Sequence, residues 1–471
     1  MITFVSRRRL LKLSSFMSLG SVLPAGRAVA QERPNIVFIL ADDLGYADLS
    51  IFGRDDYETP HLDKLARQGI RFTQAYANSA VCSATRTALI TGRYQNRLRV
   101  GLEEPIAGNA KGSPVLGLPP DHPTLPSLLR GTGYNTTLVG KWHLGYPPHF
   151  GPLKSGYDHF FGIVGGAVDY FTHKDGAPNG DLGLYDDLIP VERHGYLTNL
   201  LADRAVATIE PYARSKHPFL LSLHFTAPHW PWEGPADEDE SKRIRSLWDL
   251  DGGSQKTYGE MVRSLDDSIG RVLAALDEGG LTNNTIVVFT SDNGGERFSK
   301  TWPFTGMKEE LLEGGLRVPV IVRWPGRIAA DTVSEQPIIS MDWLPTLLEA
   351  AGTAPDPAFP PDGESVLPAL LSQAKPHSRS FFWHYKANDQ DAHRSANWKY
   401  LRIAGNEFLF DVVTDPRERA NLKDRYPDVF LRLKEEVAAW KKTMLPTDPQ
   451  SYSAGWTGHN LADHYSSQSE Q

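Results

Sequence analysis

Short apolar runs recur along the chain at the length of buried strands. A run of this length that is apolar on both faces is typical of a strand covered on both sides in a parallel or mixed sheet. Amphipathic helical patterns such as Tyr258–Leu276 separate them. The alternation predicts an α/β architecture with a central mixed sheet flanked by helices. The predicted strands are Asn35–Leu40, Thr136–Val139, Phe219–His224, Thr285–Thr290 and Val318–Val322.

Polar side chains follow four of these strands directly. Open α/β sheets place ligands outside the carboxyl ends of their strands, so we expect these side chains to gather at one site. In chain order they are Asp42 and Asp43, then Lys141 and His143, then His229, then Asp292 and Asn293.

A second, smaller folding unit is predicted near the C-terminus. A stretch rich in Pro, Asp and Ser from Pro355 to Pro376 marks a boundary. Beyond it, three short strand patterns and one amphipathic helix predict an α+β subdomain: Ser380–Tyr385, Trp398–Ile403, Glu407–Asp411 and Tyr426–Lys441. We therefore expect a catalytic domain over 31–375, a C-terminal subdomain over 376–445 and a polar tail, loose or docked, over 446–471.

The first thirty residues have the features of a targeting segment. Arg7-Arg8-Arg9 precedes a modestly apolar stretch, and Ala28-Val29-Ala30 fits an A-x-A cleavage site. This pattern predicts a twin-arginine signal peptide over 1–30, export by the twin-arginine machinery and a periplasmic or secreted enzyme. Serines interrupt the apolar stretch, so no stable membrane anchor is expected.

Charge and cysteine content narrow the function further. The net charge of -8 argues against a general nucleic-acid or anionic-membrane surface. Cys82 is the only cysteine, so an internal disulfide is excluded and this residue needs another explanation. Cys82 opens a predicted helix, where free N–H groups and the helix dipole favour a thiolate or a bound anion. Arg86, one turn along, lies on the same face.

Five stretches of sequence occur together in this chain. In chain order they are N-I-V-F-I-L-A-D-D-L-G-Y from Asn35, C-S-A-T-R-T-A-L-I-T-G-R from Cys82, G-K-W-H-L-G from Gly140, S-D-N-G-G from Ser291, and M-K-E-E-L-L-E-G-G-L-R-V-P from Met307. The chain resembles the type I sulfatases of the alkaline phosphatase superfamily over nearly its whole mature length. The resemblance implies an alkaline phosphatase-like fold and hydrolysis of sulfate esters.

Carried over residue by residue, the resemblance gives Cys82 as the precursor of formylglycine, whose hydrated aldehyde attacks sulfur. A formylglycine-generating enzyme is then a required partner. The metal ligands would be Asp42, Asp43, Asp292 and Asn293, together with the modified Cys82. Hard oxygen donors without an imidazole suit Ca²⁺, or alternatively Mg²⁺.

The resemblance also implies roles for the cationic and imidazole side chains. Arg86 would hold formylglycine, and Lys141 and Lys308 would contact sulfate. His229 would assist departure of the leaving group with Lys308 and belong to the substrate-binding set, whereas His143 would take a proton from the second hydroxyl of the diol. His224 lies inside an apolar run and is interpreted as a satisfied core histidine.

Two other functions stay open at this point. One is a phosphatase or phosphodiesterase of the same superfamily, normally with a Thr or Ser nucleophile and two zinc ions, because fold alone does not separate these activities. The other is a non-catalytic binder of sulfated glycans with an unmodified cysteine. Ala84, which stands where proline is usual, also leaves open which maturation enzyme acts on Cys82.

The substrate is the least determined property. Residues 156–173 are similar to the same stretch of arylsulfatase B-like enzymes, which favours a sulfated carbohydrate over a small aryl sulfate. Three tryptophans are candidates for lining a sugar cleft, although packing explains them equally well. They are Trp230, Trp232 and Trp302.

Overall fold

The structure is a computed structural model that describes residues 33–175, 180–215, 217–244 and 252–457. The predicted signal peptide over 1–30 and residues 458–471 of the predicted tail lie outside the described residues.

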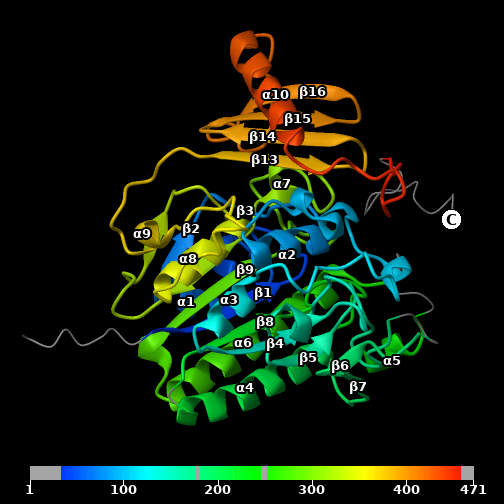
Figure 1. The fold of residues 1–471 in the computed structure, drawn as a ribbon, viewed down its shortest axis with the longest axis vertical. Helices are drawn as coiled ribbons and strands as arrows, with labels where there is room; N and C mark the ends of the chain where they lie inside the picture. Colours follow the sequence, from blue (N-terminus) through cyan, green and yellow to red (C-terminus); the bar gives the residue numbers. More distant parts are fainter. Residues whose placement is uncertain (1–32, 176–179, 216, 245–251, 458–471) are drawn as a thin grey trace, which may run out of the picture. The chain divides into compact units, whose positions relative to one another are not determined.

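A large mixed sheet forms the centre of the described chain (Figure 1). Its five central strands are parallel, and the outer pairings include antiparallel ones. Within the described residues the order across this sheet is β11 (Thr332–Ser334), β2 (Ile70–Phe72), β10 (Val320–Arg323), β9 (Thr285–Ser291), β1 (Asn35–Ala41), β8 (Phe219–His224), β4 (Asn135–Gly140), β5 (His159–Ile163), β6 (Leu184–Asp186) and β7 (Ile189–Pro190).

Alternate side chains of β1 enter two separate cores, which explains why its sequence is apolar throughout. Ile36, Phe38 and Leu40 pack into one core, and Val37 and Ile39 into the other. The first core includes α2 (Cys82–Thr91), α3 (Leu125–Gly131) and α8 (Trp343–Ala350), and the second includes α1 (Pro60–Arg67), α4 (Leu197–Ser215) and α6 (Gln255–Glu278). The predicted α/β architecture is confirmed.

The C-terminal part forms an antiparallel sheet of its own, with a helix packed against it (Figure 1). The strands run β13 (Ser380–Tyr385), β14 (Gln390–Ser395), β15 (Trp398–Ile403) and β16 (Asn406–Asp411), and the helix is α10 (Pro427–Lys441). The small α+β subdomain is confirmed, but β14 was not predicted. Its sequence, Q-D-A-H-R-S, is polar although five of its six residues are buried, so it lacks the apolar alternation that marks a strand.

The remaining elements are short. A two-stranded pairing joins β3 (Ala75–Tyr76) to β12 (Ile338–Ile339), and the shorter helices are α5 (Glu238–Ser241), α7 (Glu313–Leu316) and α9 (Leu367–Leu370). The 3₁₀ turns are Ser50–Phe52, Gln95–Arg97, Arg99–Leu102, Gly108–Ala110, Pro152–Ser155, Thr282–Asn284 and Ser340–Asp342. Among the described residues, no helix is long and apolar enough to cross a membrane.

Helix α2 is packed between two cores. Leu89 and Ile90 belong to the core against the large sheet, whereas Ala84 and Ala88 belong to a third core shared with the C-terminal sheet. All ten residues of the helix are buried. Because the interior is close-packed on both sides, the position of Cys82 depends on the C-terminal subdomain as well as on the large sheet.

The described part of the predicted tail is docked rather than loose. The Ser453 hydroxyl donates to the Glu104 carbonyl at 2.6 Å, and the Asn388 amide donates to the Trp456 carbonyl at 2.7 Å. These bonds tie residues 446–457 to both the large domain and the C-terminal sheet.

Candidate active site

Four parallel strands deliver the predicted site residues to one edge of the large sheet. In the register, Ala41 at the end of β1 pairs with Ser291 at the end of β9, so Asp42 and Asp292 follow at the same level. On the other side of β1, Leu40 pairs with His224, and His224 pairs with Gly140 at the end of β4. Gly140 has φ +118, and a Cβ there would lie 1.8 Å from the His224 carbonyl. Glycine therefore lets the chain turn directly into Lys141.

Cys82 begins α2, and the residue before it provides no side-chain cap. Val81 is the N-cap and makes no capping hydrogen bond, so the first-turn N–H groups have no side-chain acceptor at this position. An apolar cap combined with the positive end of the helix dipole suits an anion bound beside Cys82.

Arg86 and Lys141 form ion pairs with two carboxylates near Cys82, those of Asp292 and Asp42. Lys141 Nζ lies 2.6 Å from Asp42 Oδ2, and the Arg86 guanidinium lies 2.8 Å from Asp292 Oδ2. Arg86 also donates to the Lys141 carbonyl at 3.0 Å. None of these four side chains is more than 2% exposed, so each charge is compensated by a neighbour rather than by solvent.

Lys308 and His229 lie together beside Asp43. Lys308 Nζ donates to Asp43 Oδ2 at 2.7 Å and lies 3.4 Å from His229 Nε2. Burial alone lowers the pKa of Lys308, but the carboxylates of Asp43 and Glu296 raise that pKa well above its usual value. His229 Nδ1 donates to the Trp230 carbonyl at 2.6 Å, which leaves Nε2 as the acceptor facing the ammonium group.

His143 faces Cys82 with a defined ring nitrogen. Nε2 lies 2.7 Å from the Ile106 carbonyl, and only a protonated nitrogen donates to a carbonyl oxygen. Nδ1, 3.3 Å from Cys82 Sγ, is therefore the unprotonated nitrogen. Burial, followed by the charge of Lys141, lowers the pKa of His143 well below its usual value, so the ring is neutral and basic only toward position 82.

Two buried oxygens fit a metal ion. Asp42 Oδ1 and Asn293 Oδ1 have no hydrogen-bond partner among the described residues, although both side chains are fully buried. Oxygen and sulfur atoms of Asp42, Cys82 and Asp292 lie within 4.8 Å of one another. Asn293 Nδ2 donates to Asp43 Oδ1 at 2.7 Å, which brings the fourth predicted ligand to the same group. Carboxylate and amide oxygens are the ligands that hard cations prefer.

The Cys82 thiol itself is poorly suited to attack. Burial raises its pKa to about 11, and the charge of Lys141 only partly offsets this increase. The thiolate is the reactive form of cysteine, so an unmodified Cys82 is a weak nucleophile at neutral pH.

All ten predicted site residues thus lie together at this edge. Two further groups that contact them were not predicted from the sequence. The Ile106 carbonyl sets the His143 tautomer, and a backbone oxygen has no signature in a sequence. Glu296 Oε2 lies 3.5 Å from Lys308 Nζ, and its place directly after S-D-N-G-G is the signal that would have found it.

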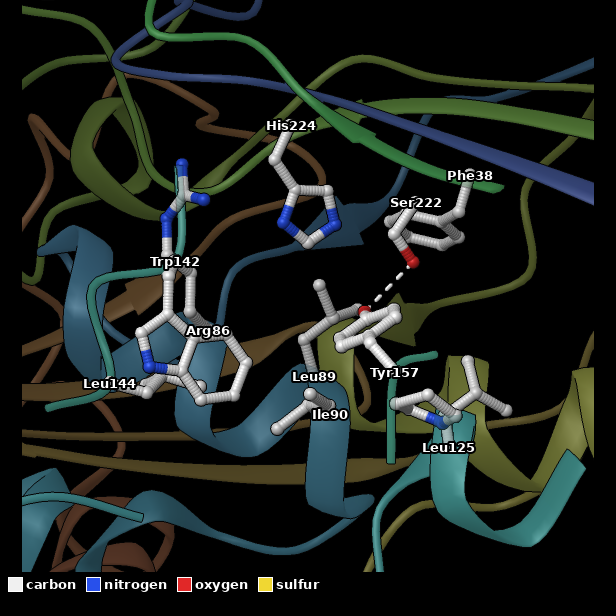
Figure 2. A pocket seen from close by; sticks show the side chains of 11 residues that line it. Phe38, Arg86, Leu89, Ile90, Leu125, Trp142, Leu144, Tyr157, Ser222 and His224 are labelled. Atoms are coloured by element: carbon white, nitrogen blue, oxygen red, sulfur yellow. Dashed lines mark hydrogen bonds between the residues drawn. The ribbon is translucent and has the colours of Figure 1, made fainter. Parts of the chain in front are cut away.

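The interpretation of His224 as a core residue agrees with its burial. It is 9% exposed, and burial lowers the pKa of its ring well below the usual value, partly offset by a backbone hydrogen bond to Lys141. Figure 2 shows the ring beside a cavity of about 20 Å³ that Arg86, Trp142 and Tyr157 also line. This volume holds about one water molecule. Cys82 does not line the cavity, although Arg86 does.

The three candidate tryptophans have different surroundings. The Trp230 ring lies against the His229 ring at a tilt of 45°, with centroids 4.3 Å apart, so it belongs to the site. Trp232 is buried against Phe298 and is a packing residue. Trp302 is 56% exposed, with the Arg417 guanidinium 5.0 Å from its ring centroid.

Comparison with known proteins bears on this arrangement directly. The Sulfatase family model matches residues 34–353, and the model of the N-sulphoglucosamine sulphohydrolase C-terminal region matches residues 307–443. The chain belongs to the sulfatase family. It is 32% identical to N-acetylgalactosamine-6-sulfatase of Mus musculus over 92% of this chain and 90% of that protein. It is also 32% identical to steryl-sulfatase of Mus musculus over 91% of this chain and 85% of that protein.

Solved structures of sulfatases share the fold. The structure of Ps i-CgsB in complex with k-i-k-neocarrahexaose has a TM-score of 0.79 and 29% identity, over 90% of this chain and 95% of that one. A phosphonate monoester hydrolase of Agrobacterium radiobacter is similar in fold alone, with a TM-score of 0.62 and 20% identity over 88% of this chain and 96% of that one. This sulfatase is therefore a sulfuric ester hydrolase with an alkaline phosphatase-like fold.

Proposed function

We propose that this sulfatase hydrolyses the sulfate esters of a carbohydrate through formylglycine made from Cys82. One observation carries the proposal: the side chain at position 82 lies 3.3 Å from the unprotonated nitrogen of a neutral, buried histidine, at the dipole-positive end of a helix. Formylglycine at this position would supply, as its hydrate, a hydroxyl nucleophile that the thiol does not provide.

The cationic side chains bind and orient the sulfate group. Lys141 forms a buried ion pair with Asp42 at 2.6 Å, and Lys308 forms one with Asp43 at 2.7 Å. Arg86 is fixed through Asp292 and the Lys141 carbonyl, and we assign it to holding the modified side chain. Preformed charges in a buried site stabilise the charge on a transferring group without reorganisation.

His143 accepts a proton at Nδ1 from the hydroxyl group at position 82. Its ring is held for this purpose by the Ile106 carbonyl on Nε2. Proton removal from the remaining hydroxyl expels sulfate, and attack of water on sulfur is not required.

Lys308 and His229 assist the leaving group. His229 is neutral because burial, and then the charge of Lys308, lowers its pKa well below its usual value. Lys308 is therefore the proton-bearing partner of the pair. We assign to Lys308 the donation toward the departing sugar oxygen, with His229 Nε2 orienting the ammonium.

Calcium is the proposed metal, held by Asp42, Asp43, Asp292 and Asn293, with position 82 completing the set. A bound ion would supply positive charge that attracts sulfate and favours the deprotonated nucleophile. The all-oxygen donors of the four side chains support calcium or magnesium over zinc.

A sulfated carbohydrate is the preferred substrate class. The relatives include N-acetylgalactosamine-6-sulfatases at 30–32% identity, and Ps i-CgsB at 29% identity was solved with an oligosaccharide. Trp230 beside His229 offers an aromatic face of the kind that sugars stack upon.

A phosphatase with two metal ions is disfavoured by one contact. Asp42, Asp43 and His229 form a second group of donors within 4.8 Å of one another. The Lys308 ammonium stands beside two of them, at 2.7 Å from Asp43 and 3.4 Å from His229. Its positive charge opposes binding of a second cation there.

Maturation and export complete the proposal. We propose that a formylglycine-generating enzyme modifies Cys82 despite Ala84, and that the folded enzyme is exported through the twin-arginine machinery to the periplasm or beyond. The alternative of a non-catalytic glycan binder predicts an unmodified thiol.

The test joins mass spectrometry with activity. The tryptic peptide Phe72–Arg86 is expected to carry an aldehyde in place of the thiol, and the same preparation is expected to desulfate members of a sulfated-sugar panel in the presence of Ca²⁺. An intact thiol in an active preparation would refute the formylglycine nucleophile. Activity on aryl sulfates but on no sugar of the panel would refute the substrate class.

A further inference from the structure

The loop that carries Lys308 is fixed to the large domain on one side. The Lys308 amide donates to the Gly295 carbonyl at 2.9 Å, and the Glu309 amide donates to the Ala80 carbonyl at 2.9 Å. Glu309 has φ +70, in the left-handed region that a side chain other than glycine rarely adopts. A backbone in this conformation persists only where surrounding contacts hold it.

On the other side, a side chain of the C-terminal sheet bonds to the loop. Gln390 on β14 is fully buried. Its Nε2 donates to the Glu309 carbonyl at 2.8 Å, and its Oε1 accepts from the Leu311 amide at 2.9 Å. The carboxamide thus pairs with the backbone on both sides of Glu310, as a neighbouring strand would.

A third bond from Gln390 fixes the carboxamide itself. Nε2 also donates to the Ala387 carbonyl at 3.2 Å, so the side chain is anchored to its own sheet while it holds the loop. The following turn is tied to the same subdomain, because the Glu313 amide donates to Glu418 Oε2 at 2.7 Å.

We propose that Gln390 is a positioning residue for Lys308. This inference rests on the proposed role of Lys308 in leaving-group departure. Gln390 touches neither substrate nor metal. It holds the strained backbone next to Lys308 so that Nζ stays within reach of both Asp43 and His229. The C-terminal subdomain thereby takes part in catalysis through one carboxamide.

The test uses the leaving group as its readout. The mature, Ca²⁺-loaded enzyme is assayed on aryl sulfates whose phenols span a wide range of pKa, together with an alkyl sulfate. Leaving groups of low pKa need little help from Lys308, whereas those of high pKa need protonation. In Gln390→Met, which keeps the length but loses both hydrogen-bonding groups, kcat for the poorest leaving group is expected to fall roughly 100-fold. For the best leaving group, kcat falls about threefold or less.

Two further variants separate positioning from folding. Gln390→Glu keeps the acceptor for Leu311 but loses the donor to Glu309, so an intermediate selective loss is expected. Tyr400→Phe removes a part-buried hydrogen bond to Glu407 within the same sheet, and should leave the ratio between substrates unchanged. The ratio of kcat values in one preparation does not depend on the folded or matured fraction, so a poorly folding variant still gives a result.

Two results would overturn the inference, and they differ. An equal loss on every leaving group in both Gln390 variants would show that Gln390 only supports folding. Inactivity of the wild-type chain on every sulfate ester would refute the proposed function, and this role with it.

Discussion

The active site and the interface beneath the C-terminal sheet each bury a cluster of charges, but the two clusters differ in how closely their oxygens are paired with cations. At the interface, Glu313 accepts from Tyr76 and Arg317 on one oxygen and from Lys399 on the other, at 2.7–3.0 Å. At the active site, Asp42 Oδ1 and Asn293 Oδ1 have no hydrogen-bond partner among the described residues, and Asp42 Oδ1 lies 3.7 Å from the Arg86 guanidinium. Both sets of side chains are almost completely buried.

The difference separates a structural cluster from a functional one. Burial of a polar atom without a partner is costly, so it persists where another requirement maintains it. The carboxylate of Glu313 is satisfied by protein groups alone, which ties the two parts of the chain together. The site oxygens are arranged for a ligand that the protein does not supply.

The largest effect is expected at position 82. Cys82→Ala removes the precursor of the nucleophile, so kcat should fall by about 10⁴-fold or more, as when other enzymes lose a covalent nucleophile. Thermal unfolding without added Ca²⁺ should change little, because among the described residues Cys82 Sγ makes one weak hydrogen bond, to His143 Nδ1 at 3.3 Å. Activity and melting curves on the same purified samples check this. Retention of a tenth of the activity would rule out Cys82 as the source of the nucleophile.

Lys399 is expected to show the opposite pattern. Lys399→Met leaves Glu313 and Glu418 without their shared cation, and breaking a buried ion pair costs about 3–5 kcal/mol. Denaturant unfolding should record this loss, whereas kcat per formylglycine should change far less than in Cys82→Ala. The double variant Lys399→Met with Glu418→Gln should recover part of the loss. A stability unchanged by Lys399→Met would contradict the structural role.

Metal binding should stabilise the site and leave the interface unaffected. Ca²⁺ at about 100 times its Kd should raise the free energy of unfolding by about 3 kcal/mol, because the ion binds only the folded chain. Chelation should reverse the gain, and Asn293→Ala should reduce it. Equal stabilisation of wild type and Asn293→Ala would place the ion elsewhere.

The smallest effect concerns acid stability of the C-terminal sheet. Burial lowers the pKa of His393 to about 4, from 6.5, and Phe382 stacks on its ring. The unfolded chain binds a proton between these values and the folded chain does not, so stability is full above pH 6.5 and falls toward pH 4. From pH 7.5 to pH 5 this group should cost about 2 kcal/mol. His393→Asn should therefore reduce the difference in unfolding free energy between pH 7.5 and pH 5. If this difference stays the same in the variant, His393 does not cause it.

Prediction from the sequence succeeded where a residue's own chemistry or periodicity identifies it. The continuous apolar runs gave β1, β8 and β9 to within one residue, and the polar residues after them gave the site. It failed for β14, because the Q-D-A-H-R-S strand is stabilised by bonds across an interface rather than by apolar alternation. His224 shows a smaller failure, since burial was foreseen but the cavity beside the ring was not.

The sequence by itself determined the family, the α/β fold and which ten side chains were expected to lie together at the candidate site, because these depend on residue types and spacings along the chain. Only the tertiary structure decided which nitrogen of His143 faces Cys82, that Lys308 stands beside Asp43 and His229, and that Gln390 holds the Lys308 loop. These facts depend on contacts between segments up to 265 positions apart, and on backbone carbonyls that every residue carries alike. Only the geometry of the fold decides which backbone group accepts a hydrogen bond. No pattern of side chains along the sequence therefore predicts it.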